Sequence, residues 1–322
     1  MRQVYGDVGE FFHAVRVFGE ELASVSWAAL AIALGLQFAK VFVRTFAWRN
    51  ILQAAYPEVR VPWRPVLGAY VAGVGVNAIV PGRGGDLVKL YLVRRRLPDT
   101  TYTTLASTLF TETLLDILLA TSIFVWALTQ GVLPSLSVLP SVPAFDWGWL
   151  FSHSRLTATV VALLTVAVIW FSWWASRHVE DFKTRIGRGV AILRDRPRYA
   201  REVASWQLLS WVFRIASLYW FLRAFHVHAS IHNALLAQVV DSIATLLPFS
   251  PGGAGTKQGL LVYVLKGQAP SSQLLAFSVG QYVAITIFNV AIAAVAIFAM
   301  LRTLRLREIL GRAKAAESET GT

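Results

Sequence analysis

Four ionisable side chains lie inside apolar stretches of the sequence that are otherwise suited to lipid. Glu112 and Asp116 are four residues apart, so a helix places both on one face. Arg214 and Asp241 each lie near the middle of another apolar run. A charge at the centre of a membrane helix costs about 2.5–3.5 kcal/mol on insertion scales, so all four are expected to face the protein interior. They are interpreted either as ion pairs that fix helix packing or as residues that line or gate a headgroup site or proton relay.

Two Pro/Gly-rich tips interrupt further apolar runs: NAIVPGRGGD at 77–86 and LLPFSPGGAGTK at 246–257. Glycine lets the backbone turn and approach a ligand closely, and a helix that begins after such a tip directs N–H groups and partial positive charge toward it. The tips therefore predict a site for an anion such as a lipid phosphate; the alternative is two short spans with ordinary loops. The residues assigned to substrate binding are Asn77, Pro81, Arg83, Gly84, Gly85, Asp86, Pro251, Gly252, Gly253, Gly255 and Lys257.

The composition is that of a polytopic membrane protein. Of the 322 residues, 56% are hydrophobic and only 15% are charged, with a mean hydropathy of +0.55. The net charge of +12 is attributed to cytoplasmic loops rich in Lys and Arg, and nucleic acid is not expected as a partner. Cysteine is absent from the sequence. No catalytic, metal-binding or nucleotide-binding motif is recognised, and GGAGTK lacks Walker A spacing, so no cofactor, metal or catalytic residue is assigned.

Hydropathy predicts five full spans, which are joined by loops of unequal charge. The segment 177–201 and the end of the chain are rich in Lys and Arg and are expected in the cytoplasm, whereas 130–154 has neither residue and is expected outside. The predicted spans are Ser24–Ala47, Leu105–Leu128, Leu156–Ala175, Val203–Phe225 and Leu274–Leu301.

The two interrupted segments cannot be full spans if this orientation holds. The first, Val66–Val80 with Leu87–Val93, must return to the cytoplasm, and the second, Ile231–Leu247 with Leu260–Leu265, must return outside. The fold class is therefore predicted as all-α, a helical bundle with two re-entrant hairpins related as an inverted repeat. Such paired, broken segments indicate a binding site near the membrane midplane.

Three regions are predicted along the chain. Residues 1–23 form an interfacial amphipathic segment, 24–301 form the transmembrane domain, and 302–322 form a basic cytoplasmic tail. The expected location is the cell membrane, with the protein as a multi-pass chain whose C-terminus is cytoplasmic. Homo-oligomers, and a glycosyltransferase or lipid-synthase partner, are left open.

Three motifs together resemble the lysylphosphatidylglycerol synthase transmembrane-region family of flippase-like membrane proteins. They are NAIVPGRGGDLVKLYLVRR, ETLLDI and LPFSPGGAGTKQ, and the likeness extends from about Trp27 to Leu301. The resemblance implies a bundle around a lipid cavity. It also implies that Asn77, Pro81, Arg83, Gly85 and Asp86 shape the first tip, that Asp116 is the acid of the span, and that Pro248, Pro251, Gly252, Gly253 and Gly255 shape the second tip. Lys257 and Gln258 stand where members commonly have a glutamate.

The resemblance implies movement of a lipid headgroup between leaflets. The leading hypothesis is a translocase (flippase) of an anionic phospholipid or a polyprenyl-phosphate-linked lipid. Without a nucleotide site, movement would be downhill or driven by membrane potential, about 2.3 kcal/mol per charge per 100 mV. Two alternatives stay open: a membrane enzyme acting on a lipid-linked substrate, and a non-catalytic lipid-binding partner of a glycosyltransferase. The chain lacks the cytosolic synthase domain, so it is not expected to make lysyl-lipid itself. Because no catalytic motif is found, the leading expectation is a transporter-like protein and not an enzyme.

Overall fold

The computed structural model describes residues 24–80, 84–97, 100–130, 180–246 and 256–320. Within these ranges every regular element is a helix, as the sequence predicts. Three of the described helices contain stretches long and apolar enough to cross a membrane: Trp27–Ala55, Tyr102–Ala127 and Ser271–Met300. The helices themselves are α2 (Trp27–Ala55), α5 (Tyr102–Thr129) and α13 (Ser271–Thr320). Three of the five predicted spans are thereby confirmed as helices of sufficient length.

The remaining predicted spans differ in outcome. Val203–Phe225 corresponds to α10 (Ser205–Ala224), a helix that is not among those three candidate spans. Leu156–Ala175 and the interfacial segment 1–23 lie outside the described residues. The first helix also continues beyond its predicted end at Ala47, because its apolar face continues: Trp48, Ile51 and Leu52 are completely buried.

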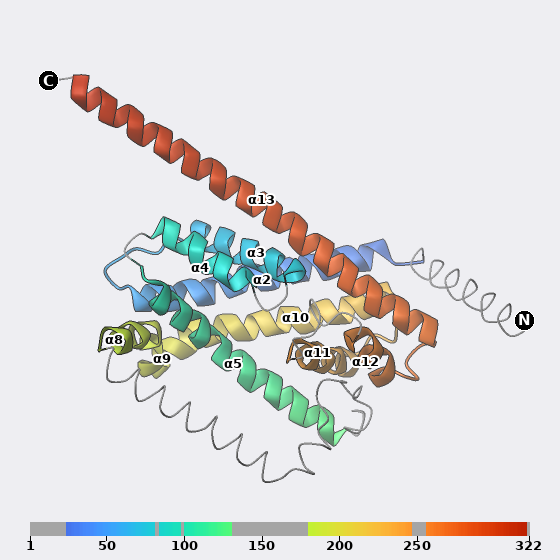
Figure 1. Cartoon of the computed structure of the whole chain (residues 1–322). Coiled ribbons are helices and arrows are strands. Elements are labelled where there is room, and N and C mark those ends of the chain that lie inside the picture. The colour runs from blue at the N-terminus through green and yellow to red at the C-terminus, as the bar shows by residue number, and fades with distance from the viewer. Residues whose placement is uncertain (1–23, 81–83, 98–99, 131–179, 247–255, 321–322) are drawn as a thin grey trace, which may run out of the picture.

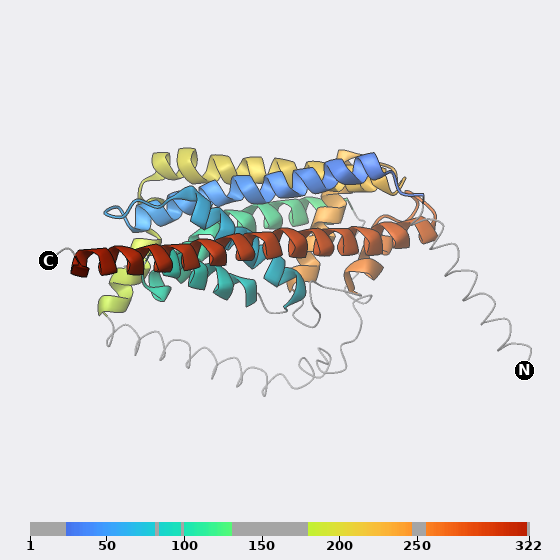
Figure 2. The same ribbon diagram turned by 90° about the horizontal axis from the view of Figure 1, so that it is seen from above.

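Among the described helices, α2 and α10 share the most extensive contact, and they run antiparallel. Ser26 N–H donates to the carbonyl of Ala224 at one end, and Asn50 Nδ2 donates to the carbonyl of Glu202 at the other. Between them Ser217 Oγ donates to the carbonyl of Ala33. Figure 2 shows the two helices side by side along one edge of the bundle.

The first interrupted segment folds as a helical hairpin, α3 (Trp63–Ile79) and α4 (Gly84–Arg96). Its two helices pack backbone to backbone, since a Cβ added to Gly85 would lie 1.9 Å from the carbonyl oxygen of Gly73. Helix α13 packs across α3, where a Cβ on Gly75 would meet the Cβ of Ala293 at 2.1 Å. Glycines at these positions therefore set the spacing of three helices.

The second interrupted segment also yields two short helices, α11 (Ile231–Leu246) and α12 (Thr256–Val264), which contact each other. Figure 1 shows α3 and α4 toward one end of the bundle, and α11 and α12 toward the other end. The first break falls where the sequence predicts it, since α3 ends at Ile79, whereas the residues between α11 and α12 lie outside the described part of the chain. Re-entry from opposite faces, and the inverted repeat, remain predictions.

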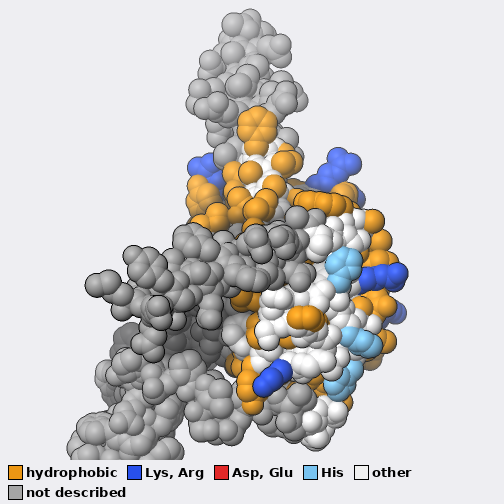
Figure 3. Space-filling view, turned by 90° about the vertical axis from the view of Figure 1, so that its right-hand side faces the viewer, with side chains coloured by type: hydrophobic (Ala, Val, Ile, Leu, Met, Phe, Trp, Pro, Cys, Tyr) orange, Lys and Arg blue, Asp and Glu red, His pale blue; other side chains and the backbone are white. Residues whose placement is uncertain are grey.

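The two ends of the bundle are built differently. At one end lie the C-terminal ends of α2 and α4, together with α8 (Glu180–Gly189), η2 (Ala191–Arg194), α9 (Arg196–Tyr199) and η3 (Ala200–Ala204) (Figure 1). At the other end α2 and α13 begin, and Figure 3 shows histidine and apolar side chains there beside a few Lys and Arg. Separate hydrophobic clusters fill the two ends, one around Phe221 and Phe277 and the other around Trp48 and Tyr70.

Candidate functional site

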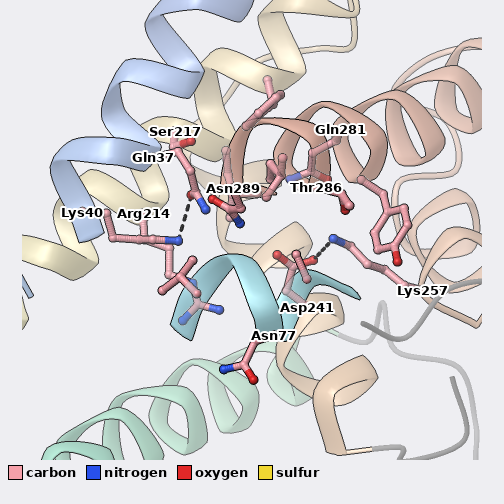
Figure 4. Close-up of a pocket in the computed structure, with 16 residues that line it drawn as sticks. Gln37, Lys40, Asn77, Arg214, Ser217, Asp241, Lys257, Gln281, Thr286 and Asn289 are labelled. Carbon is pink, nitrogen blue, oxygen red and sulfur yellow. Dashed lines mark hydrogen bonds and ion pairs between the residues drawn. The ribbon is translucent and has the colours of Figure 1, made fainter. Parts of the chain in front are cut away.

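A cavity of about 250 Å³ lies inside the bundle, where α2, α3, α10, α11, α12 and α13 converge. Figure 4 shows that its polar side chains come from all of these helices. The lining is unusually polar for the interior of so apolar a chain. Its polar and charged members are Gln37, Lys40, Asn77, Arg214, Ser217, Asp241, Lys257, Gln281, Tyr282, Thr286 and Asn289.

Two of the cations that line this cavity have no carboxylate partner among the described residues. Lys40 Nζ donates to Oε1 of Gln37 at 2.8 Å, and the Arg214 guanidinium lies 5.0 Å from the centre of the Trp211 ring. No carboxylate in the described part of the chain comes within ion-pair distance of either cation. Charges inside a membrane protein normally pair, so these two leave the cavity attractive to an anion.

The third cation of the cavity, Lys257, is paired. Its Nζ lies 2.8 Å from Oδ1 of Asp241, and the two side chains are 9% and 19% exposed. Lys257 lies in the first turn of α12 and Asp241 lies within α11, so the pair joins the two helices of the second interrupted segment. Three basic side chains against one carboxylate leave the described lining rich in basic groups.

Glu112 and Asp116 do not line the cavity; they bind a residue of the first span instead. Arg44 Nε donates to Glu112 Oε1 at 2.6 Å, and Arg44 Nη2 pairs with Asp116 Oδ2. Tyr70 also donates to Glu112 Oε1, at 2.7 Å, and Trp211 Nε1 donates to Asp116 Oδ1 at 2.9 Å. This buried network ties α2, α3, α5 and α10 together, with one cation between two carboxylates.

The described part of the first tip is organised around Asn77. Its Oδ1 accepts the N–H of Gly85 at 2.7 Å, and its Nδ2 donates to Asp86 Oδ1 at 3.3 Å. Asp86 Oδ1 in turn lies 3.1 Å from Nζ of Lys89. Asn77 therefore caps the first turn of α4, and one N–H that would otherwise be free to bind an anion is already satisfied.

Replacing Asn77 with Ala should lower stability by about 1 kcal/mol, the usual effect of losing a side-chain cap. The reason is that the N–H of Gly85 would lose its acceptor within a buried turn. Thermal unfolding of the purified protein in detergent would measure this. An unchanged unfolding temperature would show that water replaces the cap without loss.

The structure places the predicted site residues in three groups. Asn77, Arg214, Asp241 and Lys257 line the cavity. Glu112 and Asp116 belong to the Arg44 network, and Gly84, Gly85 and Asp86 shape the α3–α4 contact without lining the cavity. The other members predicted for the two tips lie outside the described residues: Pro81, Arg83, Pro251, Gly252, Gly253 and Gly255.

Sequence reasoning missed Lys40 and Arg44, which contribute a cavity cation and the partner of both acids. The signal was present, because Lys40 and Arg44 lie four residues apart inside the first predicted span, like Glu112 and Asp116 in the next. It also missed Gln281 and Asn289, because no sequence pattern distinguishes these two amides from other polar residues. Among the described residues, no group of three or more His, Asp or Glu side chains could hold a metal ion.

Comparison with known families fits this architecture. The family model described as the lysylphosphatidylglycerol synthase TM region matches residues 11–293, which is most of the chain. No curated protein and no solved structure shows significant similarity to it. The match covers both interrupted segments, the paired acids of α5 and every residue that lines the cavity. The chain therefore belongs to the lysylphosphatidylglycerol synthase TM region family, a family of membrane proteins related to lipid handling.

Proposed function

We propose that this protein is a translocase (flippase) that moves an anionic phospholipid or a polyprenyl-phosphate-linked lipid between membrane leaflets. Membership of a lipid-handling membrane family supports the substrate class. The single observation that carries the proposal is the pair of cations, Lys40 and Arg214, that face an internal cavity without carboxylate partners among the described residues. Burying an unpaired cation is costly, so a site that keeps two of them is suited to an anionic ligand.

The proposal treats Lys40 and Arg214 as the phosphate-binding groups, from α2 and α10. A guanidinium offers several donors in a fixed plane, and an ammonium adds a compact charge. Figure 4 shows both side chains on the same side of the cavity, opposite Asp241 and Lys257. A phosphate held there would have its acyl or prenyl chains directed to the surrounding lipid, because the cavity has room for a headgroup only.

The proposal places the protein in the cell membrane with its C-terminus in the cytoplasm. The C-terminal ends of α2, α4 and α13 and the segments α8 and α9 lie toward one end of the bundle (Figure 1). Basic residues concentrate in these segments, as cytoplasmic loops require. The hairpins α3–α4 and α11–α12 would then enter from opposite faces and bring their broken ends toward the cavity at mid-membrane.

Replacing Arg214 with Gln should reduce lipid movement at least tenfold, because the phosphate loses its planar cationic partner. The measurement is translocation of acyl-labelled phosphatidylglycerol in proteoliposomes, read by quenching of the outer leaflet. Lys40→Gln should act in the same direction. Arg223→Gln is the matched control, since Arg223 is an exposed arginine on the same helix that lies over Trp220.

Other outcomes would select other functions. Transport by Arg214→Gln at the wild-type rate would contradict the cavity as the route. Lipid that binds but never crosses would favour the non-catalytic partner of a glycosyltransferase. A change in the mass of the bound lipid would favour a membrane enzyme.

A further inference from the structure

The face of α13 that lines the cavity carries two buried amide side chains with unused hydrogen-bonding capacity. Gln281 is completely buried, and neither its Oε1 nor its Nε2 has a partner among the described residues. Asn289 lies two turns further along the same face, is 6% exposed, and its Oδ1 also lacks a partner there. Buried polar groups are nearly always hydrogen-bonded, so these two amides are available to a ligand of the cavity. Gln207 and Gln238 also carry an unpaired side-chain oxygen among the described residues, but neither lines the cavity.

We propose that Gln281, with Asn289 further along the same face of α13, binds hydroxyl groups of the ligand and so selects a phosphate-bearing lipid whose headgroup is neutral and hydroxylated. The inference rests on the proposed function, because Lys40 and Arg214 hold the phosphate. It adds a determinant of specificity on a helix that carries neither cation. The headgroup is defined by its chemistry, as a polyol such as glycerol or a sugar.

Hydrogen-bond satisfaction decides among the headgroup classes. A phosphodiester oxygen only accepts, so it would satisfy Nε2 of Gln281 and leave Oε1 without a donor. An ammonium group only donates, so it would leave Nε2 unsatisfied, and the basic groups of the lining would oppose it. A trimethylammonium group offers no conventional hydrogen bond. A hydroxyl both donates and accepts, so hydroxyl groups can complete both atoms of Gln281.

The arrangement of the cavity fits a ligand that has a phosphate at one end and a hydroxylated headgroup at the other. Figure 4 shows Gln281 on the side of Asp241 and Lys257, whereas Lys40 and Arg214 lie on the other side. A volume of about 250 Å³ suits a small headgroup. A phosphate at the cations therefore leaves its substituent facing Gln281. Asp241, which also lines the cavity, supplies a further acceptor for a hydroxyl.

The test compares two lipids of equal headgroup charge, one with headgroup hydroxyl groups and one without. Phosphatidylglycerol and phosphatidylmethanol carry the same charge, but the second has no headgroup hydroxyl. Each lipid competes for the full-length protein in detergent, and native mass spectrometry counts the bound molecules. Wild type should prefer phosphatidylglycerol about tenfold, the effect of one or two hydrogen bonds. Gln281→Leu should remove this preference by weakening phosphatidylglycerol alone, whereas Arg214→Gln should weaken both lipids.

A second pair of probes distinguishes the two kinds of lipid that carry such a headgroup, a phospholipid with glycerol and a polyprenyl phosphate with a sugar. A short-chain polyprenyl phosphohexose is compared with the corresponding methyl polyprenyl phosphate in the same way. The hydroxylated lipid whose preference is lost in Gln281→Leu identifies the source. Gln238→Leu is the matched control, since Gln238 is another completely buried glutamine, outside the cavity, and should leave both preferences unchanged. Should Gln281→Leu fail to fold, Gln281→Asn withdraws the same amide by one methylene and should also reduce the preference.

Two results would overturn the inference while leaving the cation site in place. One is equal binding of the hydroxylated and methylated lipids by wild type. The other is an unchanged preference in Gln281→Leu, which would mean that water completes the amides. Failure of wild type to bind any of the four lipids would instead contradict the proposed function itself.

Discussion

Replacing Arg44 with Gln should destabilise the protein by roughly 3–5 kcal/mol, the usual result of removing one partner from a buried ion pair. Glu112 is only 3% exposed and Asp116 is 20% exposed, and Arg44 is the cation that contacts both. Tyr70 and Trp211 would still donate one hydrogen bond to each carboxylate, but neither carries a charge. Two negative charges in the interior of the bundle would then repel each other. Chemical or thermal unfolding in detergent would measure the loss.

Two companion variants separate loss of the ion pair from loss of the side chain. Combining Arg44→Gln with Glu112→Gln and Asp116→Asn removes all three charges and should recover most of the stability, because residues of one network are strongly coupled. Lys40→Gln, one turn earlier on α2, removes a cation without a described carboxylate partner and should change stability by less than about 1 kcal/mol. Full stability of Arg44→Gln alone would contradict the structural role assigned to the network.

Gly85→Ala should destabilise the α3–α4 hairpin by about 3 kcal/mol, the upper part of the range for overpacking. The new Cβ would lie 1.9 Å from the carbonyl oxygen of Gly73 and 2.8 Å from the backbone nitrogen of Asn77. Both are backbone atoms, so no side-chain rotation can relieve the clash, and the helices must separate. Separation would also withdraw the Asn77 cap from the N–H of Gly85. The expected readout is a lower unfolding temperature with the total helix content of the folded protein unchanged.

Gly259→Ala is the matched control for this prediction. Gly259 lies within α12, and apart from its chain neighbours and the backbone of its own helix no atom of the described residues lies within 4 Å of the position its Cβ would take. Alanine is preferred to glycine inside a helix by about 0.5–1 kcal/mol, so this variant should be as stable as wild type or slightly more stable. Gly35→Ala in α2 should behave in the same way. Equal effects of all three substitutions would contradict the role of close backbone packing at Gly85.

Local sequence determined the class of the protein and the places where its helices break. Apolar runs of about 20 residues require helices in a membrane, because each backbone polar group must be satisfied within its own segment. The same local chemistry located the interruptions at 77–86 and 246–257, and the structure ends α3 at Ile79 and α11 at Leu246. Sequence also marked Arg214 and Asp241 as charges inside apolar runs and Lys257 as a cation of the second tip, and all three line one cavity.

Only the tertiary structure decided which charges meet. Lys40 and Arg44 are one helical turn apart on α2, yet Lys40 faces the cavity whereas Arg44 binds Glu112 and Asp116 on α5. Neither partner can be read from spacing along the chain, because 68 residues separate Arg44 from Glu112. Which of the two cations faces the cavity and which faces α5 depends on how α2 is rotated about its axis. That rotation is set by the packing of whole helix faces against α10 and α5. Gln281 and Asn289 became candidates for the same reason: an amide in a sequence is unremarkable until its surroundings leave it buried without a partner.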